Sequence, residues 1–298
     1  MATAIDDLIA AERLPPSYAA MVDRWWRPLA RQIAHWHASA GRPLIIGING
    51  AQGSGKSTVC RFLQASLLPE QELSATVVAL DDLYLPLQAR EHMARDIHPL
   101  FRTRGVPGTH DVDAGIALLE AMVAGRDALI PRFSKALDDR FPQADWARHL
   151  GKVDILLFEG WCVGARPQDA AALDQPLNAL EAQEDPNGIW RRQVNSALET
   201  SYAQWFSMID HLVMLKPPSF DHVLKNRLLQ EHKLRATAPD APGIMDDATV
   251  ARFVSHYERV TRHMAADLPD HVDLLYQLSD GQDVISCTGL GQEDGHVS

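Results

Sequence analysis

The sequence of 298 residues contains only three cysteines, Cys60, Cys162 and Cys287. An odd number of widely separated cysteines predicts neither a disulfide framework nor a zinc site, and it is typical of a reducing compartment. No apolar run approaches the roughly 20 residues that a membrane-spanning helix needs. The N-terminus carries Asp6 and Asp7, which is not typical of a basic signal sequence or an acid-poor transit peptide. We therefore expect a cytoplasmic protein without a membrane partner.

The sequence is also poor in positive charge. It has 28 lysines and arginines against 39 aspartates and glutamates, so its formal net charge is −11. Nucleic-acid binding rewards positive charge, so a nucleic-acid partner is not expected. Internal repeats and low-complexity tracts are absent as well, and 46% of the residues are hydrophobic, enough for a sizeable core. Nothing in the pattern indicates an oligomeric state.

What the sequence does contain is a complete phosphate-binding motif. Gly50 is followed by four residues and then by Gly55, Lys56 and Ser57, which matches the pattern G-x-x-x-x-G-K-[S/T]. An apolar run before it predicts a buried strand, and the residues after it predict a helix. Glycines allow successive N–H groups to point at one anion, and the helix N-terminus adds a partial positive charge. A glycine-rich turn that binds nothing is the alternative.

This motif predicts a site for ATP and Mg²⁺. Lys56 would reach the β- and γ-phosphates, and Ser57 would offer its hydroxyl group to Mg²⁺. The residues expected to bind ATP are Gly50, Ala51, Gln52, Gly53, Ser54, Gly55, Lys56, Ser57 and Thr58.

Four short apolar runs predict the fold class. They lie at 44–48, 76–80, 153–158 and 211–215, and the intervals between them leave room for helices. Strands that alternate with helices are typical of α/β proteins with a mainly parallel sheet flanked by helices, here a P-loop NTPase fold. The carboxyl ends of parallel strands meet at one edge, where ligands bind. Polar groups that directly follow these runs should therefore converge.

The domain organisation follows from the segments between the runs. We expect a helical extension at 1–42, one main domain at 43–288 and a flexible tail at 289–298. The extension should contain a helix at 17–40 that is broken near Pro28 and capped at Gly41. Two long insertions lie in the main domain, at 85–152 and 164–210. The first should form much of an acceptor pocket, 169–188 should be an acidic surface excursion, and 278–282 should be a turn.

Carboxylates follow two of the predicted strands. Glu159 lies where a P-loop fold places the carboxylate that orients Mg²⁺, although a surface glutamate at a strand end is the alternative. Asp81 and Asp82 follow the run at 76–80. Phosphoryl transfer needs a group that holds the acceptor hydroxyl in line and takes its proton. Asp81 is our candidate for this role and for a metal ligand beside Ser57 and Glu159. Asp82 would help it, and a turn or capping role for the pair is the alternative.

Two loops and one helix concentrate positive charge. The loop at 102–111 predicts either an anion or polyol clamp or a plain turn with a helix cap. The basic residues of the loop at 131–135 would alone be surface charges. The helix at 221–235 predicts a mobile lid that brings Arg227 to the transition-state charge, with a solvated basic face as the alternative. The residues expected to contact the acceptor are Asp82, Tyr84, Arg104, Thr109, His110, Arg132 and Lys135.

Taken in order, these segments resemble the D-glycerate 3-kinase family. That family belongs to the P-loop kinases, together with uridine kinase, pantothenate kinase and phosphoribulokinase. The resemblance covers most of 44–278. It rests on GINGAQGSGKST at 47–58, LDDLYLP at 80–86, RGVPGTHD at 104–111, PRFSK at 131–135, FEGW at 158–161, RLLQE at 227–231 and FVSHY at 253–257. Of these, the stretch at 104–111 is the most specific.

The resemblance implies a kinase that transfers the γ-phosphoryl group of ATP to a hydroxyl of D-glycerate, giving 3-phosphoglycerate and ADP. In this comparison Asp81 aligns with the catalytic carboxylate of the wider group, and Arg227 falls in its lid. The carboxylate of glycerate would need a cation, for which Arg104, Arg132 and Lys135 are candidates. The alternatives are a kinase of this fold for a nucleoside, pantothenate or a sugar phosphate, and a non-catalytic ATP-binding regulatory or assembly protein.

Overall fold

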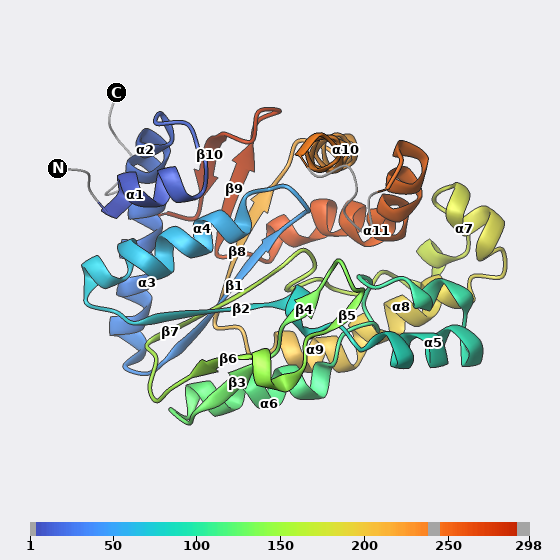
Figure 1. The fold of residues 1–298 in the computed structure, drawn as a ribbon, viewed down its shortest axis with the longest axis horizontal. Helices are drawn as coiled ribbons and strands as arrows, with labels where there is room; N and C mark the ends of the chain where they lie inside the picture. The colour runs from blue at the N-terminus through green and yellow to red at the C-terminus, as the bar shows by residue number, and fades with distance from the viewer. Residues whose placement is uncertain (1–3, 238–244, 291–298) are drawn as a thin grey trace.

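The computed structural model describes residues 4–237 and 245–290, and a six-stranded sheet forms its centre (Figure 1). The strands lie in the order β10-β9-β8-β1-β7-β2. Neighbouring strands run parallel except for β10, which pairs antiparallel with β9. The bounds are β1 Leu44–Gly50, β2 Ala75–Ala79, β7 Ile155–Gly160, β8 His211–Lys216, β9 Leu274–Leu278 and β10 Val284–Thr288. The predicted α/β fold with a mainly parallel sheet is confirmed.

The four predicted strands correspond to β1, β2, β7 and β8. β1 and β7 are buried along their whole length, and such continuous apolar runs are typical of strands covered on both faces. The sequence pattern does not predict β9 or β10, because β9 alternates buried with half-buried residues and most of β10 is exposed or half-buried. The predicted turn at 278–282 is confirmed as part of the connection between these two strands. Of the predicted tail, 291–298 lie outside the described residues.

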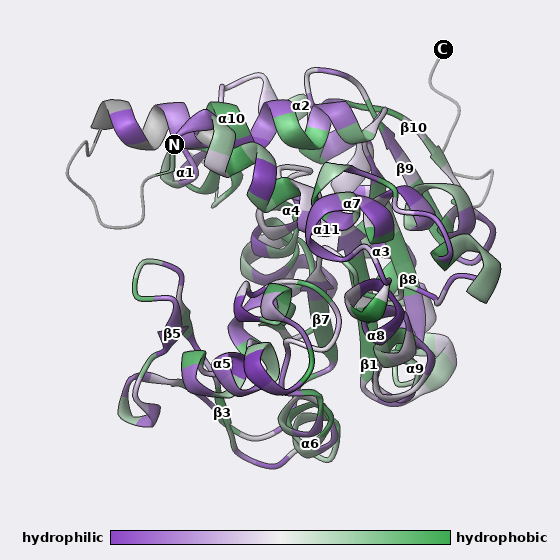
Figure 2. Cartoon of the chain, turned by 90° about the vertical axis from the view of Figure 1, so that its right-hand side faces the viewer, coloured by the Kyte–Doolittle hydropathy of each residue, from purple (hydrophilic) through white to green (hydrophobic). Residues whose placement is uncertain are grey.

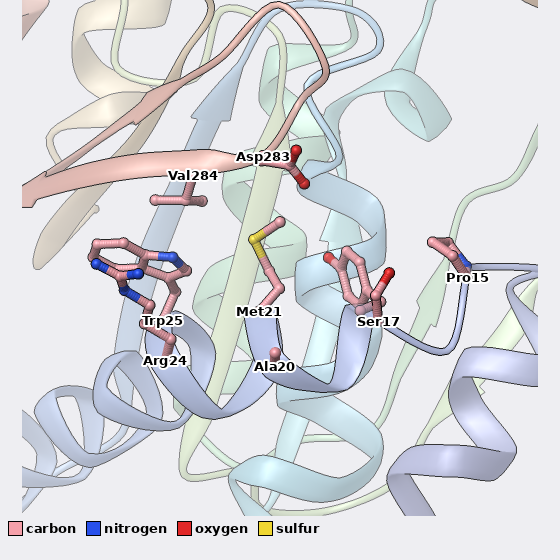
Figure 3. Close-up of a pocket in the computed structure, with 9 residues that line it drawn as sticks. Pro15, Ser17, Ala20, Met21, Arg24, Trp25, Asp283 and Val284 are labelled. Atoms are coloured by element: carbon pink, nitrogen blue, oxygen red, sulfur yellow. The ribbon is translucent and has the colours of Figure 1, made fainter.

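One face of the sheet is covered by helices from the N-terminal part of the chain. These are α1 Ala4–Ala11, α2 Tyr18–Met21, α3 Arg27–Ala40 and α4 Lys56–Phe62. Their buried side chains and those of the strands form one apolar cluster. Figure 3 shows Met21 and Trp25 beside Asp283 and Val284, at the β10 end of the sheet. The helices at 4–40 therefore contribute to the same core as the strands.

The helix predicted at 17–40 is not broken at Pro28. α2 continues through a π-helical turn, Val22–Trp26, into α3, and the residues at both junctions keep helical dihedral angles. A proline inside an α-helix clashes with the carbonyl group four residues earlier. The wider π-helical turn lies where this clash would arise, so the helix accommodates the ring without ending. The predicted cap is confirmed, since Gly41 takes a left-handed conformation with φ of 64°.

The opposite face carries α6 Val112–Val123, α8 Ile189–Glu199, α9 Ser201–Phe206 and α11 Asp247–Asp267. The other helices are α5 Leu87–Asp96, α7 Ala179–Glu184 and α10 Phe220–Thr237. The first insertion adds two short antiparallel pairs, β3 Ala128–Ile130 with β6 Ala147–His149 and β4 Phe133–Ser134 with β5 Asp139–Arg140. Figure 2 shows the hydrophobic colour on β1 and β8, between more hydrophilic outer helices. Within 4–237 and 245–290, no helix combines the length and hydropathy that a bilayer crossing demands.

The predicted surface excursion at 169–188 is correct for most of its side chains but misses two buried acids. Glu181 on α7 is 1% exposed and pairs with Arg259 on α11, with Oε2 and Nη2 2.6 Å apart. Asp185 is equally buried and pairs with Arg191 on α8. A buried charge is tolerated only where an opposite charge and hydrogen bonds compensate it. The acids are therefore held inside by cations from outside the segment, which the local composition does not reveal.

We expect Arg259→Met to lower the free energy of unfolding by about 3–5 kcal/mol, because it leaves the Glu181 carboxylate buried without its cation. Urea unfolding followed by circular dichroism measures this. Arg252→Met is the matched control, since Arg252 pairs with Glu184 between the same two helices but both side chains are exposed; its cost should be at most about 1 kcal/mol. The double variant Arg259→Met/Glu181→Leu should regain part of the loss. Equal midpoints for Arg259→Met and the control would contradict the assignment.

Candidate active site

The phosphate loop lies between β1 and α4, at the carboxyl edge of the parallel strands. The predicted ATP-binding residues run from Gly50, the last residue of β1, to Thr58 in the first turn of α4. Within this stretch Ala51 and Ser54 are buried, whereas Ser57 is exposed. The N–H groups at the start of a helix carry partial positive charge, so this segment can bind phosphate groups.

The lid candidate, α10, lies directly against this loop. Gly53 has φ of 79°, and a Cβ atom at this position would lie 3.0 Å from the Cβ atom of Asn226 on α10. A residue other than glycine would therefore be strained here and would also press on the helix. A small apolar cluster of Ala51, Val223, Val250 and Val254 joins the loop to α10 and α11.

Three polar side chains meet at the start of α4. The hydroxyl group of Ser57 donates a hydrogen bond of 2.7 Å to Oε1 of Glu159, the second-last residue of β7. Nζ of Lys56 lies 3.9 Å from Oε2 of the same carboxylate. Burial raises the pKa of Glu159, although Lys56 and Ser57 oppose this effect. The arrangement brings together the cation, the hydroxyl and the carboxylate that the sequence predicts for a nucleotide and its metal ion.

The oxygen atoms of Ser57 and Glu159 fit Mg²⁺. This ion prefers oxygen ligands and usually takes one or two from the protein, with the rest from water and substrate phosphates. In the part of the chain that the structure describes, no group of three or more acidic, histidine or cysteine side chains forms a fuller metal site. Any Mg²⁺ held here would therefore take most of its ligands from water and the nucleotide phosphates.

Asp81 lies one strand away, on the 3₁₀ turn Leu80–Leu83 that follows β2. Each of its carboxylate oxygens accepts a hydrogen bond: Oδ1 from the hydroxyl group of Tyr84 at 2.8 Å, and Oδ2 from Nζ of Lys135 at 2.7 Å. Burial alone would raise the pKa of Asp81, but the charges of Lys135 and Lys56 outweigh it and hold the pKa below its usual range. Asp81 is therefore an ionised carboxylate within the electrostatic reach of the phosphate-loop lysine.

Asp82 holds a neighbouring loop in place instead of taking part in the cluster around Asp81. Its Oδ1 atom accepts a hydrogen bond of 3.0 Å from the backbone N–H of Phe133, the first residue of β4. Burial raises its pKa, while the bond to Phe133 opposes this. Asp82 thus fixes the loop that carries Arg132 and Lys135. The Arg132 side chain is exposed, and its guanidinium lies 5.0 Å from the centre of the Phe141 ring.

Arg104 braces the hairpin formed by β4 and β5. Its guanidinium forms an ion pair with Asp138, lies 5.5 Å from the centre of the Phe133 ring and donates a hydrogen bond to the carbonyl group of Lys135. Arg90 also pairs with Asp138 at 3.2 Å. The charge of Arg104 is therefore already compensated by Asp138, whereas Lys135 is 63% exposed.

Two buried aromatic side chains hold the backbone beside Arg104. The hydroxyl group of Tyr257 donates a hydrogen bond to the carbonyl group of Arg104, and Nε1 of Trp161 donates one to that of Gly105, each at 3.0 Å. Gly105 has φ of 129°, and a Cβ atom there would lie 1.9 Å from the Tyr257 hydroxyl oxygen. Only glycine fits this position. Sequence reasoning assigns no role to Trp161 or Tyr257, although both lie in stretches that carry the family resemblance.

The hydroxyl group of Thr109 bonds to the backbone of its own loop, which differs from the expected contact with the acceptor. It is fully buried, accepts a hydrogen bond from the N–H of Gly105 and donates one to the carbonyl group of Val106. These two bonds close the loop itself. The physical reason is that a short threonine side chain in a tight turn is well placed to bond to its own backbone.

His110 is 4% exposed and stacks on Tyr84, with ring centres 4.6 Å apart. Its Nδ1 atom lies 2.5 Å from the hydroxyl oxygen of Tyr202. Burial lowers the pKa of His110 to about 3, although Asp81 opposes this, so the ring is neutral at physiological pH. The histidine therefore supports Tyr84 and supplies no positive charge to an acceptor.

Arg227 lies on α10, with Nη2 2.7 Å from Oε2 of the buried Glu231. The charge of Arg227 also acts on the hydroxyl group of Tyr257. Burial and the charge of Asp81 raise the pKa of this phenol, whereas Arg104 and Arg227 lower it. The charges of Asp81, Arg104 and Arg227 therefore all act on the Tyr257 hydroxyl group.

The chain resembles known kinases in sequence and structure, although no family model matches it. It is 36% identical over 227 residues to the uncharacterized kinase mug58 of Schizosaccharomyces pombe, covering 73% of this chain and 79% of that protein. It is 30% identical over 225 residues to the chloroplastic D-glycerate 3-kinase of Arabidopsis thaliana, covering 72% of this chain but only 46% of the plant protein.

A solved structure extends the likeness to the fold. The D-glycerate 3-kinase from Cryptococcus neoformans var. grubii superposes with a TM-score of 0.72 at 23% identity, over 90% of this chain and 98% of that one. The overall fold therefore agrees with that of this solved structure. The chain thus belongs to the family of P-loop kinases that includes D-glycerate 3-kinase.

Proposed function

We propose that this kinase transfers the γ-phosphoryl group of ATP to a hydroxyl of D-glycerate, giving 3-phosphoglycerate and ADP. The observation that carries the proposal is the contact between Lys135 and Asp81, 2.7 Å apart and near Lys56. It places a cation for an anionic acceptor beside a carboxylate for its hydroxyl, within the electrostatic reach of the phosphate-loop lysine. The relatives named D-glycerate 3-kinase support the same acceptor.

In this proposal residues 50–58 bind the triphosphate of ATP through backbone N–H groups, and Lys56 balances charge on the β- and γ-phosphates. Ser57 and Glu159 would hold Mg²⁺, which supplies further charge neutralisation to the phosphates when it is bound. Arg227 would approach the γ-phosphate from α10 as the transition state spreads negative charge over the transferred group.

Asp81 would hold the acceptor hydroxyl in line with the γ-phosphate and take its proton. Tyr84 fixes one carboxylate oxygen of Asp81, and Tyr84 is itself held by stacking on His110. For the acceptor carboxylate we favour Lys135, because Arg104 is paired with Asp138 and Arg132 lies over Phe141. Lys135 is also the most exposed partner of Asp81.

An assay of ADP release across D-glycerate, uridine, pantothenate and ribulose 5-phosphate tests the proposal, with Lys56→Ala as the blank. We expect turnover that requires Mg²⁺ and is fastest with D-glycerate, and ³¹P NMR should identify 3-phosphoglycerate as the product. Faster turnover with another acceptor would reassign the substrate within the same fold. ADP release that no acceptor stimulates would favour a non-catalytic ATP-binding protein that hydrolyses ATP slowly.

A further inference from the structure

Asp81 has a strong hydrogen-bond donor on each carboxylate oxygen. Tyr84 occupies Oδ1 at 2.8 Å, and the ammonium group of Lys135 occupies Oδ2 at 2.7 Å. A charge-assisted bond of this length is among the stronger hydrogen bonds in proteins. A carboxylate that already accepts such a bond is a weaker acceptor for a hydroxyl proton. Tyr84 and Lys135 therefore weaken Asp81 as a proton acceptor, the role proposed for it.

The two donors differ in their freedom to leave. Tyr84 is 3% exposed and lies between His110, on which it stacks, and Phe133, whose ring centre is 5.2 Å away. Lys135 is 63% exposed. Only Lys135 can turn away from Asp81 without disturbing the core.

The backbone that carries Lys135 is fixed, so its ammonium group can move only within the reach of one side chain. Asp82 holds the N–H of Phe133 at one end of the hairpin. Arg104 pairs with Asp138 at the other end. An acceptor carboxylate that enters between Asp81 and the hairpin therefore meets the side chain of Lys135, which can move while the backbone that carries it stays in place.

We propose that Lys135 makes turnover depend on the negative charge of the acceptor. The acceptor carboxylate draws the ammonium group away from Asp81, and Oδ2 becomes free to accept the hydroxyl proton. The hydroxyl O–H bond then breaks and its proton goes to Asp81, while a new O–P bond forms and the bond from the γ-phosphorus to ADP breaks. This inference rests on the proposed function. It adds that the enzyme discriminates against water and neutral alcohols, because they do not displace Lys135.

Glycerol and acetate together test this role, because they offer the hydroxyl and the carboxylate of glycerate as separate molecules. In the wild-type enzyme glycerol alone should give a low kcat. Added acetate should raise that kcat by about tenfold or more, a part of the 10²–10⁴ that proton transfer contributes. If Lys135 only anchors the acceptor, glycerol will differ from D-glycerate in KM alone and acetate will not raise kcat. That result would overturn the proposal.

Lys135→Met provides the second arm. Without the ammonium group, kcat for glycerol and ADP release without any acceptor should each rise by about tenfold, and acetate should have no effect. Lys135→Arg keeps the charge and should keep the response to acetate. Lys152→Met is the matched control, an exposed lysine ahead of β7, and should behave like wild type. Sodium chloride at equal ionic strength replaces acetate in the salt control.

The two proposals fail in different ways. If D-glycerate does not stimulate wild-type turnover, the proposed function is wrong. If D-glycerate is a good substrate but acetate does not activate glycerol and Lys135→Met does not raise acceptor-independent ADP release, only the role of Lys135 is wrong.

Discussion

Asp81→Asn is expected to lower kcat for D-glycerate by about 10²–10⁴-fold, the range that general acid–base catalysis supplies. The amide has nearly the shape of the carboxylate and can still accept the hydrogen bond from Tyr84. It has no negative charge with which to take a proton. Binding of ATP should be unchanged, because Asp81 is not part of the phosphate loop. Isothermal titration with a non-hydrolysable ATP analogue and an ADP-release assay measure the two properties separately.

Asp96→Asn is the matched control for this variant, since Asp96 is exposed at the end of α5. It should keep wild-type turnover. A high rate in Asp81→Asn would remove Asp81 from the role of base. Asp82 would not then be the obvious replacement, because its carboxylate is bonded to the backbone of Phe133.

Arg227→Met should lower kcat by about 10³-fold or more, the scale of an arginine that stabilises transferred phosphoryl charge. The side chain lies on α10, paired with Glu231 at 2.7 Å, and its charge acts on the Tyr257 hydroxyl group, as the charge of Asp81 does. The loss should appear mainly in kcat, because the charge that Arg227 balances develops during transfer. Steady-state kinetics with D-glycerate and ATP varied in turn measure this.

Lys225→Met serves as the control on the same helix, since Lys225 is exposed and lies two residues from Arg227. Arg227→Lys should recover only part of the rate, because an ammonium group lacks the planar fork of a guanidinium. If Arg227→Met changed only KM for ATP, the arginine would be a ground-state contact and the lid would have another function.

Those strands were predictable whose burial requires a recognisable pattern of apolar residues in the local sequence. Strands covered on both faces, such as β1 and β7, are continuous apolar runs. Within the described residues β10 pairs with β9 alone and is largely exposed, so burial gives it no continuous apolar run that would mark it as a strand. The helix at 17–40 was predicted, but its continuity across Pro28 was missed for a similar reason. A π-helical turn is a property of the folded backbone, and no single residue type predicts it.

The candidate active site also has a part that the local sequence predicts and a part that it does not. Residues tied to a motif, such as Lys56, or to the end of a strand, such as Glu159 and Asp81, could be placed at one edge before the structure was known. Contacts between distant segments could not. The bond between Lys135 and Asp81 joins residues 54 positions apart. The inward bonds of Thr109 depend on the shape of its loop, so a hydroxyl that looked available in the sequence is occupied by the backbone.

Because α10 rests on the phosphate loop at Gly53, an outward movement of the first turns of α10 would widen the access to this side of the loop. Among the described residues, the apolar cluster that resists such a movement is small: four buried side chains, Ala51, Val223, Val250 and Val254, with a few half-buried ones packed against them. Segments with few buried contacts open at low free-energy cost. We therefore expect the first turns of α10 to open at a lower free-energy cost than the central sheet.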